Sequence, residues 1–364
     1  MDRPQHILVT GAAGYIGSAL VRELLLRGHR VTAVDSMVFG EDGLADLRRH
    51  ERMQIHRLDV RSLHRGHLTG MQAVVDLAGL SGEPVVERDA TGLDSGHHRA
   101  QVRLAQLARS SGIPRYLLAS CCSVYGHASG QVSGEDAPVR PLTHHAQSCL
   151  LAEAAILPLA TVGFAPAVVR LGLVHGRGSR MRLDLMVNAM VLSALRLRQI
   201  TLDNGGMQCR GHLHLSDAVR GLVAALEAPA SVVSRQVFNI SHHSVSSLQV
   251  AEVISAALEG RVCIHPHGGV PDLHHHRPCH QKATQLLHYA PQVGLVDSVR
   301  ELIDALGSAA ASESPEVLAM RWIHEILAQG REDRAALAYR SEYERAAVTA
   351  LRPTRSRRDL RLPG

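Results

Sequence analysis

A hydrophobic run long enough to cross a membrane is missing from this sequence. The longest apolar stretch, residues 156–169, is short and contains Pro158 and Pro166. The start of the chain also lacks the charged and apolar pattern of a secretory leader, because the first expected strand begins at Ile7. We therefore expect a cytoplasmic protein with no membrane partner.

Lysine is nearly absent as well. Among 39 lysine and arginine residues, Lys282 is the only lysine. The formal net charge is +5, but the arginines are scattered apart from a group at residues 352–358, which is typical of a solvated, disordered tail. We therefore expect no nucleic-acid partner. The six cysteines have irregular spacing, which favours free thiols over a disulfide framework.

A glycine-rich turn dominates the start of the chain. An apolar run at residues 7–10 is followed by Gly11, Gly14 and Gly17 and then by a helical apolar pattern. Strand, tight turn and helix in this order form a cradle for a dinucleotide, because the first glycine makes the turn, the second admits the pyrophosphate and the third packs the helix closely. The alternative is a βαβ unit that binds no nucleotide.

Asp35 strengthens the dinucleotide interpretation. A second apolar strand, residues 30–34, ends at this carboxylate. A carboxylate at this position can accept hydrogen bonds from both ribose hydroxyls of an adenosine, and it would repel a 2′-phosphate. The pattern therefore favours NAD over NADP.

Strands and helices alternate along the first half of the chain. Further strands are expected at 54–58, 73–77, 116–119 and 167–171, with helices ending near 111 and spanning 143–157. This alternation predicts an α/β fold, a Rossmann-type doubly wound parallel sheet, with ligands at the carboxyl ends of its strands.

The later part of the chain has a different texture. We expect a helix from Arg180 through Asn188, a strand at 200–202, and a helix at 218–227 capped by Ser216 or Asp217. The 364 residues suffice for one large domain and a smaller lobe. The expected division is an NAD-binding domain at 1–175, to which some later segments return, a small C-terminal substrate-binding lobe at 176–307, and a helical extension with a basic tail at 308–364.

With these motifs the chain resembles the extended short-chain dehydrogenase/reductase superfamily, and within it the NAD-dependent epimerase/dehydratase family acting on nucleotide sugars. The matching pieces are residues 10–17, Asp35, Asp59-Val60, residues 77–79, residues 123–126, and Arg210 with His214 and Asp217. The resemblance implies NAD as cofactor, a nucleotide sugar as substrate or ligand, and a homodimer formed through helices near 97–110 and 143–157. The implied NAD-binding residues are Gly11, Gly14, Tyr15, Ile16, Gly17, Asp35, Asp59, Val60, Leu77, Ala78 and Gly79. Asn188 and Arg210 match positions that contact the nucleotide diphosphate.

The chain departs from this family at its catalytic positions. The family uses a Ser or Thr, a Tyr, and a Lys four residues after the Tyr. The corresponding residues here are Cys121, His145 and Cys149. A histidine is a plausible acid/base near neutral pH, but a cysteine supplies no cation and is a weak hydrogen-bond donor. The tyrosine of a family strand end is also replaced, by His175.

Two functions remain open from the sequence. One is an enzyme with altered chemistry, in which His145 is the acid/base, helped by Glu83, His127 or His144. The other is a catalytically silent homologue that binds NAD or a nucleotide sugar and serves as a sensor or as the partner of an active subunit. The two differ in whether His145 can reach both the nicotinamide ribose and a sugar hydroxyl.

We expect no metal site. The densest group of metal-binding side chains is His274, His275, His276, Cys279 and His280. Adjacent histidines in a regular element do not point to one centre, so we expect a surface loop there. The Cys121-Cys122 pair is expected to pack in the core, because adjacent cysteines seldom form a disulfide.

Overall fold

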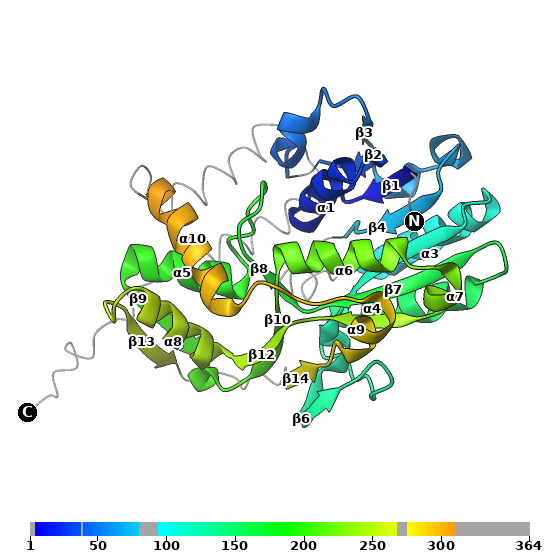
Figure 1. Ribbon diagram of the computed structural model, residues 1–364. Coiled ribbons are helices and arrows are strands. Elements are labelled where there is room, and N and C mark those ends of the chain that lie inside the picture. The colour runs from blue at the N-terminus through cyan, green and yellow to red at the C-terminus, as the bar shows by residue number, and fades with distance from the viewer. Residues whose placement is uncertain (1–3, 38, 80–93, 268–274, 311–364) are drawn as a thin grey trace, which may run out of the picture.

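The central feature of the fold is a seven-stranded parallel sheet (Figure 1). The computed structural model describes residues 4–37, 39–79, 94–267 and 275–310. The strands lie in the order β11-β7-β5-β4-β1-β2-β3. They are β1 (His6–Thr10), β2 (Arg30–Asp35), β3 (Met53–Arg57), β4 (Ala73–Asp76), β5 (Arg115–Cys121), β7 (Ala165–Leu171) and β11 (Val237–Ile240). The strand order reverses between β1 and β4, which places the ligand crevice of a doubly wound sheet at the carboxyl ends of these two strands.

Helices cover both faces of the sheet because the strand residues alternate between two cores. Ile7 and Val9 belong to the cluster that contains Leu24, whereas Leu8 belongs to the cluster that contains Leu104. The flanking helices are α1 (Tyr15–Leu26) and α6 (Leu215–Glu227) on the first face, and α3 (Asp94–Ser110) and α4 (His144–Ile156) on the second. The predicted Rossmann-type α/β fold is therefore confirmed.

A second group of elements has its own hydrophobic core and lies on the left in Figure 1. Its members are α5 (Met186–Leu197), β9 (Gln199–Asp203), α8 (Ser247–Ala257), β13 (Cys263–His267) and α10 (Leu295–Ala310). Two small sheets are formed by β8 (Leu173–His175), β10 (Cys209–His214) and β12 (His243–Ser246), and by β6 (His127–Ser133) with β14 (His275–Pro278). The short helices α7 (Ala230–Val233) and α9 (Gln281–Leu287) complete the fold. Because α6 and β11 return to the main sheet, residues 176–307 are divided between the two parts.

Three local expectations are wrong. The helix expected to open at Arg180 begins only at Met186, after Leu185 in extended backbone. The helix expected at 218–227 begins at Leu215, and its cap is the ring of His214, which accepts a hydrogen bond from the Ser216 N–H. The loop expected around 275–280 is instead strand β14 over His275–Pro278, because these residues pair with β6.

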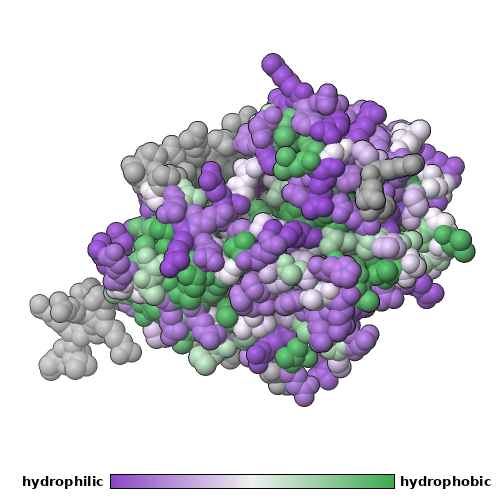
Figure 2. All heavy atoms as spheres, viewed as in Figure 1, coloured by the Kyte–Doolittle hydropathy of each residue, from purple (hydrophilic) through white to green (hydrophobic). Residues whose placement is uncertain are grey.

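Most of the molecular face in Figure 2 is hydrophilic, with hydrophobic residues in separate patches. None of the helices among the described residues is long and apolar enough to span a membrane. All six cysteines are free, as predicted. Most of the extension expected at 308–364 lies outside the described residues, and so do Glu83 and His274.

Candidate functional site

The glycine turn lies between β1 and α1, at the carboxyl edge of the sheet. Gly11 has a φ of 64°, and a Cβ on this residue would lie 2.6 Å from the Leu77 carbonyl oxygen. A Cβ on Gly17 would lie 2.0 Å from the Gly11 carbonyl oxygen. Helix α1 begins after Gly14 with no side-chain cap and no acidic residue in its first turn. The positive end of α1 is therefore left for an anion, and the turn fits the pyrophosphate of a dinucleotide.

Asp35 joins the same edge from the end of β2. Its carboxylate accepts hydrogen bonds from the backbone N–H of Ala13 at 3.0 Å and of Met37 at 2.7 Å. Burial raises the pKa of this carboxyl, although the two N–H donors oppose the shift. The carboxylate is thereby fixed beside the glycine turn, and each of its oxygens retains acceptor capacity.

Asp76, at the end of β4, fixes the third predicted segment. Its carboxylate accepts hydrogen bonds from the hydroxyls of Thr10 and Tyr116, both at 2.6 Å. The Ala78 N–H donates to Thr10 Oγ1 at 3.2 Å. Burial raises the pKa of the Asp76 carboxyl. Leu77, Ala78 and Gly79 therefore continue from a fixed strand end next to the glycine turn.

The remaining predicted NAD residues occupy more peripheral or structural positions. The Leu58 N–H donates to the Asp35 carbonyl at 2.9 Å, which brings the following residue, Asp59, close to the end of β2. The Asp59 carboxylate accepts hydrogen bonds from Arg61, which lower its pKa, and it precedes half-buried Val60. Tyr15 is buried, and its hydroxyl donates to the Gly176 carbonyl at 2.5 Å.

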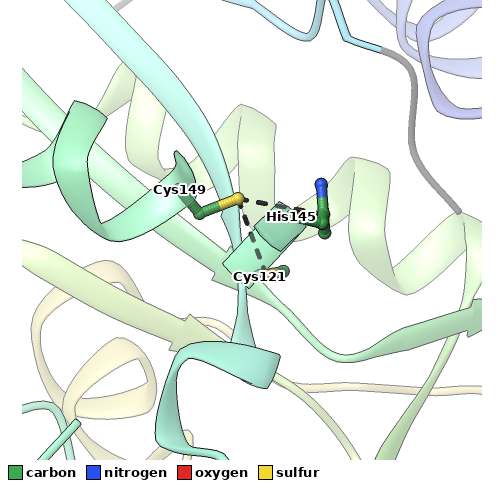
Figure 3. Close-up of side chains that lie close together, drawn as sticks. All are labelled: Cys121, His145 and Cys149. Atoms are coloured by element: carbon green, nitrogen blue, oxygen red, sulfur yellow. Dashed lines mark hydrogen bonds between the residues drawn. The ribbon is translucent and has the colours of Figure 1, made fainter. Parts of the chain in front are cut away.

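The three substituted catalytic positions come together (Figure 3). Cys121 ends β5, whereas His145 and Cys149 lie one turn apart on α4. The Cys121 and Cys149 sulfurs are 3.6 Å apart, and Cys149 Sγ lies 3.8 Å from His145 Nε2. The hydrogen bond to Cys149, together with burial, raises the pKa of the Cys121 thiol well above its ordinary value. Cys121 and His145 are only partly buried, so a ligand can reach the group.

A buried polar network supports this cluster one turn further along α4. Glu153 pairs with Arg170 of β7 at 2.7 Å and accepts a hydrogen bond from the Ser120 hydroxyl at 2.5 Å. Arg170 also donates to the Tyr125 hydroxyl at 2.9 Å, and this hydroxyl donates to Asn239 Oδ1 at 2.8 Å. The network joins α4 to three strand ends and so fixes the helix that carries His145 and Cys149.

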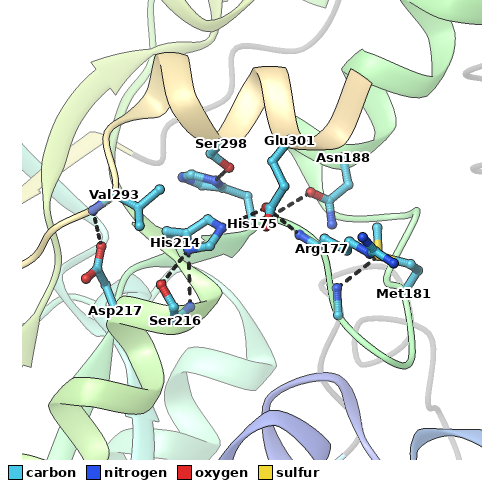
Figure 4. A network of polar contacts seen from close by, with 12 residues as sticks. His175, Arg177, Met181, Asn188, His214, Ser216, Asp217, Val293, Ser298 and Glu301 are labelled. Carbon is cyan, nitrogen blue, oxygen red and sulfur yellow. Dashed lines mark hydrogen bonds and ion pairs between the residues drawn. The ribbon is translucent and has the colours of Figure 1, made fainter. Parts of the chain in front are cut away.

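A second polar network joins α10 to residues near the ends of β8 and β10 (Figure 4). Glu301 of α10 accepts hydrogen bonds from the Arg177 N–H at 3.0 Å and from His214 Nε2 at 2.9 Å. Burial would raise the pKa of Glu301, but these two donors hold it below its ordinary value. His175 Nδ1 lies 2.7 Å from the Ser298 hydroxyl oxygen, at hydrogen-bond distance. Helix α10 is thereby tied to the loop after β8.

The two residues predicted to bind the substrate have different surroundings. Asn188 is fully buried, accepts a hydrogen bond from the Gly176 N–H and donates one to the Arg182 carbonyl. In this structure it therefore positions the 176–182 loop. Arg210 lies on β10 opposite Val245 and is half-buried.

Glu153, Arg170 and Asp76 are not among the residues predicted from the sequence. Arginine inside the apolar run 167–171 was the available signal, because a charged residue in a buried strand requires a partner. Of the proposed helpers, His144 is exposed on α4, and His127 lies on β6 with its ring 6.0 Å from that of His275. Neither belongs to the cluster of Cys121, His145 and Cys149.

Comparison with known proteins gives consistent matches. The model of the NAD dependent epimerase/dehydratase family matches residues 7–241. The uncharacterized UDP-glucose epimerase YtcB of Bacillus subtilis is 28% identical over 323 residues, which cover 83% of this chain and 98% of that protein. The dTDP-glucose 4,6-dehydratase of Streptomyces griseus is 30% identical over 60% of this chain and 69% of its own length. Among solved structures, MoeE5 in complex with UDP-glucuronic acid and NAD is 28% identical with a TM-score of 0.73, covering 84% of this chain and 99% of that one.

Proposed function

Because this chain belongs to the NAD dependent epimerase/dehydratase family, we propose that it is an NAD-dependent enzyme acting on a nucleotide sugar through a non-standard catalytic set, Cys121, His145 and Cys149. The observation that carries the proposal is the meeting of these three side chains at the carboxyl end of β5. The two sulfurs and the imidazole nitrogen all lie within 4.8 Å of one another, and two of the three residues are only partly buried.

NAD fits the cradle that this chain builds. The glycine turn and the uncapped start of α1 would hold the pyrophosphate, Asp35 would bind the adenosine ribose, and the segment after Asp76 would line the nicotinamide side. When bound, NAD supplies the hydride acceptor for a sugar C–H bond. The carboxylate of Asp35 favours NAD over NADP because it repels a 2′-phosphate.

His145 is the proposed acid/base of the site. Oxidation of a sugar alcohol releases one proton from the hydroxyl as the hydride leaves the carbon, and the His145 ring takes that proton. An imidazole is suited to this near neutral pH. Cys149 and Cys121 border the ring on one side. The buried pair of Glu153 and Arg170 fixes the position of α4 on the sheet, and with it the position of His145.

Turnover of nucleotide sugars by the whole chain tests the proposal. UDP- and dTDP-linked hexoses and uronic acids are the first panel, since the relatives carry such names. His145→Ala is expected to lower turnover by about 100-fold or more, as removal of an acid/base group does. The same change at exposed His144 on the same helix is the matched control and is expected to leave turnover unchanged.

The competing function is a silent homologue, and the missing lysine cation favours it. Such a protein binds NAD and a nucleotide sugar, yet neither reduces bound NAD nor changes the sugar. Binding without turnover across the panel would replace the proposed enzyme by a sensor or a partner subunit.

We also propose a homodimer through α3 and α4, which pack against each other. Leu151 on α4 is 53% exposed, so it is available at such an interface. Sedimentation of the wild-type chain is expected to give twice the monomer mass. Leu151→Glu is expected to give monomers, whereas a monomeric wild-type chain would contradict the assembly.

A further inference from the structure

Cys121, His145 and Cys149 offer two sulfurs and one imidazole nitrogen to a common centre. They are the only histidine, cysteine and acidic side chains in the described residues that converge in this way. Thiolate and imidazole together form a soft donor set, which is typical of zinc sites. The identities of these side chains therefore suit zinc better than magnesium or calcium.

Their separations also suit zinc. Tetrahedral zinc with bonds of about 2.3 Å to sulfur and about 2.05 Å to nitrogen places two sulfurs about 3.8 Å apart and a sulfur and nitrogen about 3.5 Å apart. The observed Cys121–Cys149 sulfur separation is 3.6 Å, and Cys149 Sγ lies 3.8 Å from His145 Nε2. The third pair, the Cys121 sulfur and the His145 ring nitrogen, lies within 4.8 Å, so these two atoms would need to approach each other for a tetrahedral site. A disulfide, in contrast, requires sulfurs about 2.0 Å apart.

The backbone holds the ligands in place. His145 and Cys149 are four residues apart on α4, a spacing that puts two ligands on one helix face. Cys121 comes from the end of a central strand. The neighbouring Cys122 is turned away, since its thiol donates to the Arg170 carbonyl at 3.4 Å. The strand thus presents one sulfur of the pair to the site.

Among the described residues, a neutralised ion pair and apolar side chains lie near the cluster. The nearest buried cation in the supporting network, Arg170, is neutralised by Glu153. Apolar side chains, among them Val124 and Leu150, pack around the cluster, and such a shell strengthens thiolate–metal bonds.

We propose that Cys121, His145 and Cys149 bind one zinc ion and leave its fourth position open. The expectation of no metal site considered only residues adjacent in sequence, whereas Cys121 and Cys149 are 28 residues apart. A Cys₂His set with an open position is the ligand set of the catalytic zinc in alcohol dehydrogenase.

The zinc site deepens the proposed function and rests on it for its chemical role. A sugar hydroxyl at the open position would lose its proton to solvent, because the positive charge of the metal lowers the pKa of a bound hydroxyl. The hydride still leaves the sugar carbon for NAD, so the balance of the reaction is unchanged. Zinc would then take over the acid/base role of the His145 ring and would supply Lewis-acid polarisation of the hydroxyl, which cysteine alone cannot.

Metal analysis of the whole, untagged chain tests the site. The chain is used without a histidine tag, because a tag would add to the weak metal binding of its 24 histidines. Protein purified without chelator is expected to contain about one zinc per chain. Cobalt added to the stripped protein is expected to give the visible bands of a tetrahedral site and a thiolate charge-transfer band. Neither readout requires NAD, a sugar or turnover.

Matched variants make the assignment specific. Cys149→Ser and Cys121→Ser are expected to weaken zinc binding by roughly 100-fold or more and to remove the charge-transfer band, since changes beside a metal already cost 10- to 100-fold. Cys263→Ser, at an exposed cysteine on β13, is the control and is expected to keep both the zinc affinity and the charge-transfer band.

Several results overturn the site. They are wild-type protein without zinc that gives no cobalt bands, zinc retained equally in Cys149→Ser and Cys121→Ser, or a Cys121–Cys149 disulfide in the purified chain. Absence of zinc together with turnover would leave the proposed function standing with His145 as its acid/base. Bound zinc without NAD binding would remove the proposed function and keep the metal site.

Discussion

Asp35 is the residue on which cofactor choice depends. Its carboxylate is held by two backbone N–H groups beside the glycine turn. Asp35→Ala is expected to weaken NAD binding by about 10- to 100-fold, because hydrogen bonds to a charged group contribute about 1.5–3 kcal/mol. Titration calorimetry with NAD and NADP measures the effect. Unchanged NAD affinity would contradict the role of Asp35.

His212 is a buried histidine that makes stability depend on pH. It lies on β10, is 1% exposed, and neither ring nitrogen has a hydrogen-bond partner among the residues that the structure describes. Burial lowers its pKa to about 3, from 6.5. Below pH 6.5 the unfolded chain therefore binds a proton that the folded chain does not, and stability falls as the pH falls towards 3.

His212→Leu is expected to remove this loss. The slope of the unfolding free energy between pH 6 and 4 should decrease by up to about 1.4 kcal/mol per pH unit, the value for one proton. Denaturant titrations at several pH values measure it. His144→Leu is the control, because the ring of His144 is exposed in the folded chain. An unchanged slope in His212→Leu would show that the buried ring does not set the acid sensitivity.

At the level of single residues, the sequence predicts local backbone geometry better than tertiary contacts. Gly11, Gly17 and Asp35 lie where the motif places them, because a tight turn and a strand end are local features. Asn188 is buried in contacts with Gly176 and Arg182, which lie 12 and 6 residues earlier and which an irregular loop folds against it. Such contacts depend on tertiary packing, which a single sequence does not encode in readable spacing.

At the level of elements, α4 is the feature that joins chemistry to stability. It presents His145 and Cys149 to the site and buries Glu153 against Arg170. The buried pair lies between α4 and β7, so its loss should loosen the helix from the sheet.

Glu153→Gln is expected to lower the unfolding free energy by about 3–5 kcal/mol, because it leaves the Arg170 charge buried without a partner. Chemical denaturation measures this change. The double variant Glu153→Gln with Arg170→Met removes both charges and is expected to lose less. A double variant that loses more than Glu153→Gln alone would contradict the argument.

Converting the site to the family pattern tests α4 and β5 together. The triple change Cys121→Ser, His145→Tyr and Cys149→Lys is expected to give a variant that reduces its bound NAD on addition of a nucleotide sugar, without dependence on zinc. Absorbance of the reduced nicotinamide, with and without chelator, measures it. No reduction would show that substrate-facing residues outside these three positions have also diverged.

Element boundaries were predictable where hydrophobic periodicity was strong. The central strands and α4 lie within a few residues of their expected limits. The start of α5 was not predictable, because Leu185 in extended backbone delays the helix. Strand β14 was not predictable either, because it depends on pairing with β6, over 140 residues earlier. Pairing between distant segments has no local signature.

At the level of the whole molecule, the main sheet carries the predicted cofactor residues, whereas the second group of elements, with α5, α8 and α10, carries a separate polar network. The sheet edge brings together the glycine turn, Asp35 and the segment after Asp76, whereas Glu301 and His214 join α10 to the loop after β8. Alternation of strands and helices was enough to predict the first part. The second has its own core, formed by elements whose order along the chain gives no such pattern.

NAD content tests the central claim most directly. The chain is purified without added nucleotide and denatured, the released NAD is assayed, and the stripped protein is titrated with NAD in a calorimeter. We expect NAD in the supernatant, or tight binding by the stripped protein, and weaker binding by Asp35→Ala. Protein that neither carries NAD nor binds it at millimolar concentration would contradict the redox function and leave the fold as a scaffold or partner subunit.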